Sequence, residues 1–277
     1  MKYMKRGLSY LLGCFWALIT LYPLFFVLIS SFKNNNEIFS SASSAMQLPS
    51  VLRFENYHDA LVVGGMARAL LNSLLLAGMS TVSTVLLASM VSFALSRFRY
   101  KLRDAVYFFF LLGIMIPVHA TLVPLSKTVA VTLKASNNPL VLALVYTAFH
   151  LPLCVMIVTA AMRGISRSMD EAAFIDGCGP FRLYARVILP LSVPALSTVS
   201  ILTFLYVYND LLFGVLFISK PELYTIPRAM QTFVGSKITT YGPIFAAIIL
   251  AIGPMIVIYL LFQSKVEQGL TAGAIKE

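Results

Sequence analysis

Residues 139–162 read PLVLALVYTAFHLPLCVMIVTAAM, a run that contains no lysine, arginine, aspartate or glutamate. A helix of this length is about 36 Å long, enough to cross a hydrocarbon layer of about 30 Å. The rest of the chain has the same character, because 59% of its 277 residues are hydrophobic and only 12% are charged. A typical soluble domain is about 25% charged. The composition therefore predicts an integral membrane protein.

Five further apolar blocks of similar length accompany this run. The six predicted spans are Leu8–Ser30, Ala69–Leu95, Ala105–Val123, Pro139–Met162, Ala195–Ile218 and Pro243–Phe262. The first is too long for the apolar core of a secretory signal, which has about 7–15 residues, so we interpret it as an uncleaved helix. We expect an all-α membrane protein with six transmembrane helices.

The spans divide the chain into four regions. Residues 1–30 contain the N-terminus and the first span, 31–68 form an extracytoplasmic loop, 69–263 form the transmembrane core, and 264–277 form a tail. The side that holds both termini carries 13 of the 21 lysines and arginines. Because short basic segments stay in the cytoplasm, we expect both termini and the tail there.

The formal charge of +10 does not indicate a nucleic-acid partner. The basic residues cluster at the ends of apolar blocks, where they set the topology of the protein in a lipid bilayer. No basic patch carries the interleaved aromatic residues on which single-stranded nucleic acid stacks. We therefore expect a lipid environment and no nucleic acid.

One cytoplasmic loop, residues 163–192, is long enough to fold, and we predict a helix-turn-helix elbow in it. Ser168 followed by Glu171 fits a capping box at the start of a short helix. Gly177 is expected to end that helix, and Gly179-Pro180 to turn the chain into a second one.

The predicted helix of the elbow has a shallow face. Met169, Ala172, Ala173 and Asp176 recur at helical spacing and therefore share one side of it. Three of these four side chains are small. Such a face allows another protein to approach closely.

The fifth span carries polar residues that need an explanation: Tyr206, Tyr208, Asn209 and Asp210. A charge at the bilayer centre costs about 2.5–3.5 kcal/mol, so Asp210 is expected to face the bundle interior or a wet cavity. Aromatic rings beside hydrogen-bonding groups suit a sugar. The alternative is that Asn209 and Asp210 bond to neighbouring helices and bind nothing.

Residues for catalysis or metal binding do not cluster in the sequence. The cysteines and histidines are far apart: they are Cys14, Cys154, Cys178, His58, His119 and His150. The cysteines are expected to be small buried hydrophobic residues. A structural role is expected for His119 and His150 rather than a proton relay. With no phosphate-binding loop either, we expect no enzyme, no metal site and no bound cofactor.

A resemblance accompanies these features. Residues 171–177, EAAFIDG, followed by Leu189-Pro190, resemble the EAA signature of the membrane subunits of binding-protein-dependent ABC importers, with Ile188 displaced by one position. Other stretches resemble the carbohydrate-uptake branch that contains the maltose-type permeases. These are FENY (54–57), LNSL (71–74), ALSR (94–97), MIP (115–117) and QGLTAGAIK (268–276).

The resemblance implies a type I ABC importer permease fold in the cytoplasmic membrane and a division of labour. An extracytoplasmic binding protein delivers a sugar, often a di- or oligosaccharide. This chain and a second permease subunit form the pathway by which alternating access moves it. Two cytoplasmic ATPase subunits bind ATP and magnesium, which would explain the missing phosphate-binding loop.

By the same resemblance, residues 169–177 are the coupling helix that docks on the ATPase. Glu171 is then expected to make a polar contact, with Asp176 beside it, while Ala172, Ala173 and Gly177 allow close packing.

One departure limits what the resemblance implies about the sugar. Many relatives have a Trp-Asn pair in the fifth span, where this chain has Tyr208-Asn209-Asp210, so the position is carried over without its sugar contacts. Two other functions stay open: a permease of the same superfamily for a non-sugar solute, and a stand-alone secondary transporter. The second is disfavoured because the halves show no repeat and Asp210 is the only candidate carboxylate for an ion site.

Overall fold

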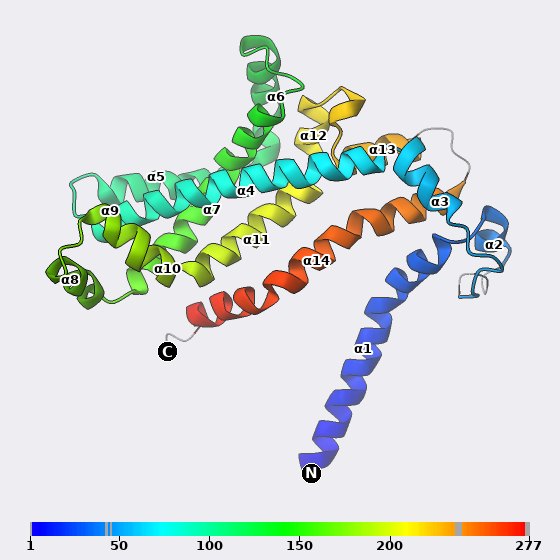
Figure 1. Ribbon diagram of the computed structural model, residues 1–277, viewed down its shortest axis with the longest axis horizontal. Helices are drawn as coiled ribbons and strands as arrows, with labels where there is room; N and C mark the ends of the chain where they lie inside the picture. Colours follow the sequence, from blue (N-terminus) through cyan, green and yellow to red (C-terminus); the bar gives the residue numbers. More distant parts are fainter. Residues whose placement is uncertain (1, 42–43, 45, 236–239, 275–277) are drawn as a thin grey trace. The chain divides into compact units, whose positions relative to one another are not determined.

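The computed structural model describes the backbone of residues 2–41, 44, 46–235 and 240–274 and side chains over 6–7, 9–41, 44, 46–231 and 240–263. Every regular element in these residues is a helix, in agreement with the predicted all-α class (Figure 1). The chain forms two compact units. Unit 1 comprises residues 1–69 and 228–254, and unit 2 comprises residues 70–227 and 255–277.

Four helices in the described residues are long and apolar enough to cross a membrane. They are α1 (Lys2–Ser30), α4 (Met66–Arg97), α7 (Pro139–Gly164) and α14 (Tyr241–Ala274). Two sharply bent pairs of segments bring the number of candidate spans to six. The helical backbone of α14 reaches into the predicted tail 264–277, whose side chains lie outside the described residues.

The prediction of a continuous third span over Ala105–Val123 is wrong. Helix α5 (Arg103–Met115) ends before Ile116, whose ψ of 114° is extended. The next helix, α6 (Val118–Lys127), continues into the π-helical turn η2 (Thr128–Thr132). The segment made of α6 and η2 is bent by 94° relative to α5. The cause is local, because the ring of Pro117 disfavours helical geometry in the residue before it.

The prediction of one helix over Ala195–Ile218 is also wrong. Helix α11 (Val193–Asn209) ends before Asp210, which is extended with a ψ of 127°, and α12 (Leu212–Phe217) begins two residues later. The carboxylate of Asp210 accepts a hydrogen bond from the backbone N–H of Phe213 at 2.9 Å. Asp210 therefore caps the start of a new helix instead of lying inside a continuous one.

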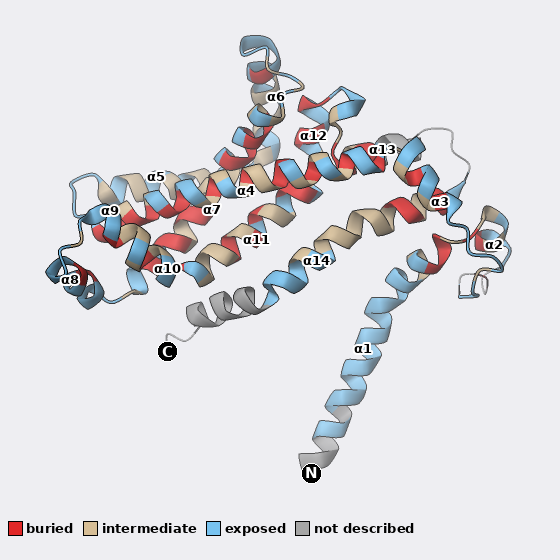
Figure 2. Cartoon of the chain, in the orientation of Figure 1, coloured by how far each residue is buried: buried red, intermediate tan, exposed pale blue. Residues whose placement is uncertain are grey.

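The core of unit 2 is built around α7, which packs against α5 and α11 and lies beside α4 (Figure 1). Gly113 of α5 permits one close approach, because a Cβ there would lie 2.8 Å from Cγ of Pro152 on α7. The hydroxyl of Ser92 on α4 donates to the carbonyl of Val155 on α7 at 3.2 Å. Helices α4 and α7 accordingly carry many buried positions, whereas α1 is almost entirely exposed (Figure 2).

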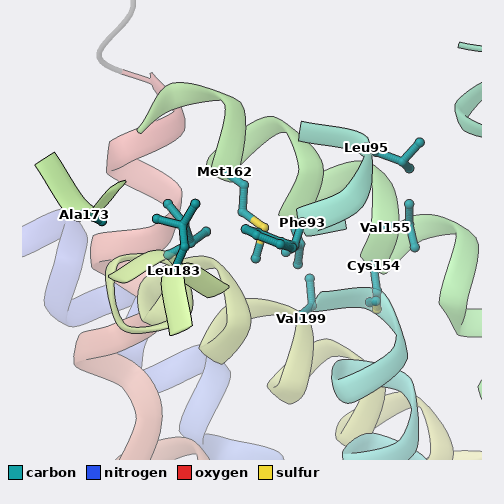
Figure 3. Close-up of a cluster of buried hydrophobic side chains, with 11 residues drawn as sticks. Phe93, Leu95, Cys154, Val155, Met162, Ala173, Leu183 and Val199 are labelled. Atoms are coloured by element: carbon teal, nitrogen blue, oxygen red, sulfur yellow. The ribbon is translucent and has the colours of Figure 1, made fainter. Parts of the chain in front are cut away.

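The end of unit 2 that follows α7 is built from short helices. These are α8 (Arg167–Ile175), α9 (Pro180–Leu183), the π-helical turn η3 (Tyr184–Ile188) and α10 (Leu189–Leu191). They join the buried cluster of α4 and α7 through Ala173 and Leu183, and in Figure 3 Leu183 lies between Ala173 and the side chains of Met162 and Phe93. The predicted elbow in residues 163–192 is therefore present and is anchored in the core.

Unit 1 holds the loop that follows α1. Its short elements are α2 (Asn35–Phe39), α3 (Glu55–His58) and the π-helical turn η1 (Asp59–Val63). The side-chain amide of Asn56 donates to the carbonyls of Ser31 and Lys33, in a space that a Cβ on Gly242 would fill. The predicted loop 31–68 thus has ordered structure of its own. The short helix η4 (Pro221–Leu223) and α13 (Ile226–Gly235) lie between α12 and α14 in the sequence.

Candidate functional site

The segment 166–178 begins and ends with local signals that define α8. The hydroxyl of Ser166 accepts a hydrogen bond from the backbone N–H of Ser168 at 3.3 Å and caps the start of the helix. The prediction that Ser168 and Glu171 form the capping box is therefore wrong. The cap lies two residues earlier, because Ile165 before it is extended and the helix begins as soon as the chain leaves that geometry.

The C-terminal end of α8 confirms the prediction for Gly177. The N–H of Cys178 donates to the carbonyl of Ala173 at 2.9 Å, and the N–H of Gly177 donates to the carbonyl of Phe174 at 3.0 Å. This pair of bonds is a Schellman motif, which requires a left-handed residue after the helix. Gly177 supplies it with a φ of +75°.

The two faces of α8 differ in burial. Asp170 and Ala173, one turn apart, are buried in the chain's own core. The predicted coupling residues Glu171, Ala172, Asp176 and Gly177 are all exposed. Ala173 is only 6% exposed, so the prediction that it offers packing space to another protein is wrong. The shared face predicted from Met169 to Asp176 is likewise replaced by a buried face centred on Asp170.

Sequence analysis missed two large apolar side chains on the exposed face of α8. Phe174 is 53% exposed and Ile175 is 87% exposed. On α9, Phe181 is also largely exposed. Large apolar side chains left uncovered together at the end of a short helix are typical of a contact surface. The signal was in the sequence, since both residues lie within EAAFIDG, but neither matched the small-residue pattern.

A buried ion pair joins α8 to the end of α4, and sequence analysis missed it as well. Nε of Arg97 lies 3.1 Å from Oδ2 of Asp170, and the two side chains are 3% and 8% exposed. Arg97 was interpreted only as one of the charges that set the membrane topology. Asp170 and Arg97 are 73 positions apart, so no local pattern could pair them.

The break between α11 and α12 is held by a second buried contact. Tyr146 is a fully buried residue on α7, and its hydroxyl donates to Oδ2 of Asp210 at 2.8 Å. The same oxygen accepts from the N–H of Phe213. Asp210 is thus engaged within the chain, which supports the structural alternative for this residue.

The other predicted pathway residues lie in different environments. Tyr208 is buried and its ring stacks on Phe204 with 5.8 Å between centroids. Tyr206 and Asn209 are exposed. The Tyr206 ring contacts the ring of His150 edge-on, at 4.4 Å. Of the four residues, Tyr206 and Asn209 are therefore the most exposed, while Asp210 is intermediate.

The described residues hold no group of three histidine, cysteine, aspartate or glutamate side chains that could bind a metal ion. The three cysteines are free, and the prediction that all are buried is wrong for Cys14, which is exposed. Cys154 is buried and Cys178 is intermediate. The long apolar helices and the capped surface helix that the described residues form are those of a membrane protein.

Comparison with known proteins identifies the family. Residues 84–272 match the family described as binding-protein-dependent transport system inner membrane component. The chain is 35% identical to the putative ABC transporter permease protein ORF2 of Caldicellulosiruptor sp., over 94% of each chain. It is 31% identical to the diacetylchitobiose uptake system permease protein of Streptomyces coelicolor, over 98% of this chain and 89% of the relative.

A solved structure shares the fold. The chain matches the crystal structure of a bacterial ABC transporter that imports the acidic polysaccharide alginate with a TM-score of 0.78. The match covers 95% of this chain and 96% of that chain at 19% identity.

This protein belongs to the binding-protein-dependent ABC transporter permeases. It is a multi-pass permease subunit of the inner membrane and acts with a binding protein and the other transporter components. A subunit of this family has no catalytic ATPase activity, and ATP binds to the partner ATPase.

Proposed function

We propose that this chain imports a sugar, of di- or oligosaccharide size, and that a partner ATPase drives it through residues 166–178. The single observation that carries the proposal is the division of α8 into two faces. Asp170 and Ala173 face the core of unit 2, whereas Glu171, Phe174 and Ile175 face outward. A helix held on one side and exposed on the other can transmit movement from a second protein.

The exposed face has the chemistry of a protein contact. Phe174 and Ile175 supply apolar area, and Glu171 and Asp176 supply charge at its edge. Buried apolar area contributes about 25 cal/mol per Å² to association, while charged groups at the rim set orientation. Ala172 and Gly177 keep the surface low enough for the backbone to approach a partner.

Transport by alternating access requires a partner that favours one of two permease states over the other. ATP binding would close the ATPase pair, draw the coupling segments of this chain and of a second, different permease subunit together, and open the pathway outward. Hydrolysis would then reset the cycle. Both termini and the segment 166–178 lie in the cytoplasm in this proposal, and residues 31–68 lie outside.

A sugar is the solute that the surroundings of the fifth span suit best. Tyr206 offers an exposed ring and Asn209 an exposed side-chain amide one helical turn away. Rings stack on the C–H faces of sugars while amides bind their hydroxyl groups. Tyr208 and Asp210 support this surface from within, through the stack on Phe204 and the bond from Tyr146. The Streptomyces relative, a diacetylchitobiose uptake permease, supports the same class.

The coupling assignment is tested by altering the exposed face of α8 in the assembled complex. Glu171→Lys and Gly177→Asp should lose both the ATPase subunits in co-purification and ATP-dependent uptake. The matched control is Glu222→Lys, an exposed acidic residue outside the coupling segment, which should keep both. Normal subunit stoichiometry and uptake in the α8 variants would rule the assignment out.

The solute is tested with the binding protein that serves this transporter. Its affinity for radiolabelled diacetylchitobiose, maltose and raffinose is compared with that for an amino-acid mixture, and uptake is followed in vesicles with ATP inside. Sugar binding and ATP-dependent uptake are expected. Preference for an amino acid would establish a non-sugar permease, and uptake driven by an ion gradient alone would establish a secondary transporter.

A further inference from the structure

Three charged residues, Arg97, Asp170 and Arg167, join α8 to the ends of the long helices α4 and α7. We call this contact the joint. Arg97, the last residue of α4, forms the ion pair with Asp170 at 3.1 Å. Its Nη2 also donates to the carbonyl of Ile165, the residue that follows α7, at 3.2 Å. One guanidinium therefore connects the ends of α4 and α7 to α8.

Arg167 completes the joint from the other direction. As the first residue of α8, it donates from Nη2 to the carbonyl of Ser96 at 2.6 Å and from Nη1 to the carbonyl of Arg97 at 3.1 Å. These carbonyls lie in the last turn of α4, where intrahelical partners are missing. Nη1 also lies 3.6 Å from Oδ2 of Asp170. Arg97 thus reaches from α4 toward α8, and Arg167 reaches from α8 back to α4.

We propose that Arg97, Asp170 and Arg167 are positioning residues that make α8 move as one body with the ends of α4 and α7. An apolar pair would hold the fold as well, because replacing a buried ion pair by hydrophobic residues is often neutral for stability. What the charged joint adds is direction, since the guanidinium hydrogen bonds to the carbonyls of Ile165, Ser96 and Arg97 fix angles as well as distances, while the ion pair with Asp170 holds the guanidinium groups in place. Oδ1 of Asp170 has no hydrogen-bond partner in the described part of the chain, so the joint depends on Oδ2.

This inference rests on the proposed coupling function and concerns what happens after the ATPase has engaged α8. Movement applied to the exposed face of α8 passes through the joint into α4 and α7. Without the joint, the extended residue Ile165 and the left-handed residue Gly177 on either side of α8 absorb it. Ala173 remains as the only buried side-chain contact of α8.

The test uses the complete complex of this chain with its partner permease and ATPase subunits, with magnesium, ATP and vanadate as the probe. Hydrogen–deuterium exchange is followed by mass spectrometry in two peptides, residues 166–178 and residues 89–98. In the wild type, vanadate trapping should change exchange in both peptides. In Asp170→Asn the change in 166–178 should remain and the change in 89–98 should be lost.

Two further variants separate positioning from folding. Arg97→Met combined with Asp170→Leu removes both charges and is expected to assemble, yet to lose the response in 89–98. Arg97→Lys keeps the positive charge at position 97 and should therefore retain part of the exchange response in residues 89–98. The matched control is Arg163→Gln, because Arg163 lies over the ring of Tyr107 on α5 at 4.9 Å and is not part of the charged joint; it should respond like the wild type.

If the double variant, which lacks the ion pair between residues 97 and 170, showed the wild-type exchange response in residues 89–98, the inference would be overturned and the joint would be a purely structural contact. The absence of any response in 166–178 of the wild type would instead contradict the proposed coupling function itself. The two failures are therefore distinguishable in one experiment.

Discussion

The proposed coupling segment 166–178 and the helix break at Asp210 are two irregular regions of unit 2. Each is held in place by the side chain of an aspartate. At the break, Asp210 binds Tyr146 and the N–H of Phe213, and these contacts lie within the chain. In the coupling segment, Asp170 binds inward while its neighbours Glu171, Phe174 and Ile175 remain exposed. An aspartate thus anchors the backbone in both places, buried in the case of Asp170 and partly exposed in the case of Asp210.

The difference lies in what each anchor supports. Asp210 fixes the break between α11 and α12 through hydrogen bonds within the chain. Asp170 fixes a rigid helix whose opposite face is left for a partner. In both regions a specific cation or hydrogen-bond donor offsets the free-energy cost of removing a carboxylate from water. The nature of that partner determines how much stability a substitution should remove.

The largest effect is expected when the anchor of the coupling segment loses its cation. Arg97→Met leaves the carboxylate of Asp170 buried beside Arg167 alone, and it should lower the free energy of unfolding by about 3 kcal/mol. Equilibrium unfolding in mixed detergent micelles measures it. The double variant with Asp170→Leu should recover most of the loss, and a double variant as unstable as the single one would contradict this account.

A smaller effect is expected at the helix break. Tyr146→Phe removes one hydrogen bond to a carboxylate and should cost about 2 kcal/mol in the same measurement. Tyr22→Phe, at an exposed position of α1, is the matched control and should stay within about 0.5 kcal/mol of the wild type. Equal costs for the two variants would show that the bond to Asp210 contributes nothing.

The smallest effect concerns the end of α8. Gly177→Ala places a Cβ on a residue with a φ of +75° and should cost about 1 kcal/mol from backbone strain alone, because open space surrounds it. Gly179→Ala is the control, since Gly179 has a φ of −75° and equally open surroundings. If both alanine variants were equally stable, the left-handed cap would have no energetic role.

Much of the fold could be predicted from the sequence because its signals are local. Runs such as residues 139–162 identify spans by length and apolarity, and α7 follows that prediction closely. Gly177 and Gly179-Pro180 marked the end of one short helix and the start of the next, as the structure confirms. The helix ends before Ile116 and Asp210 were missed because hydropathy persists through Pro117 and Asp210 although the helices stop there.

The sequence by itself determined the class of this protein and the location of the short helix for which we propose a coupling role, since apolar run length and the EAAFIDG motif both act over short distances. Only the tertiary structure decided which side of α8 is free, that Ala173 faces inward, and that Arg97 pairs with Asp170. Those outcomes depend on contacts between residues about seventy positions apart, and burial sets their energies once the helices have packed.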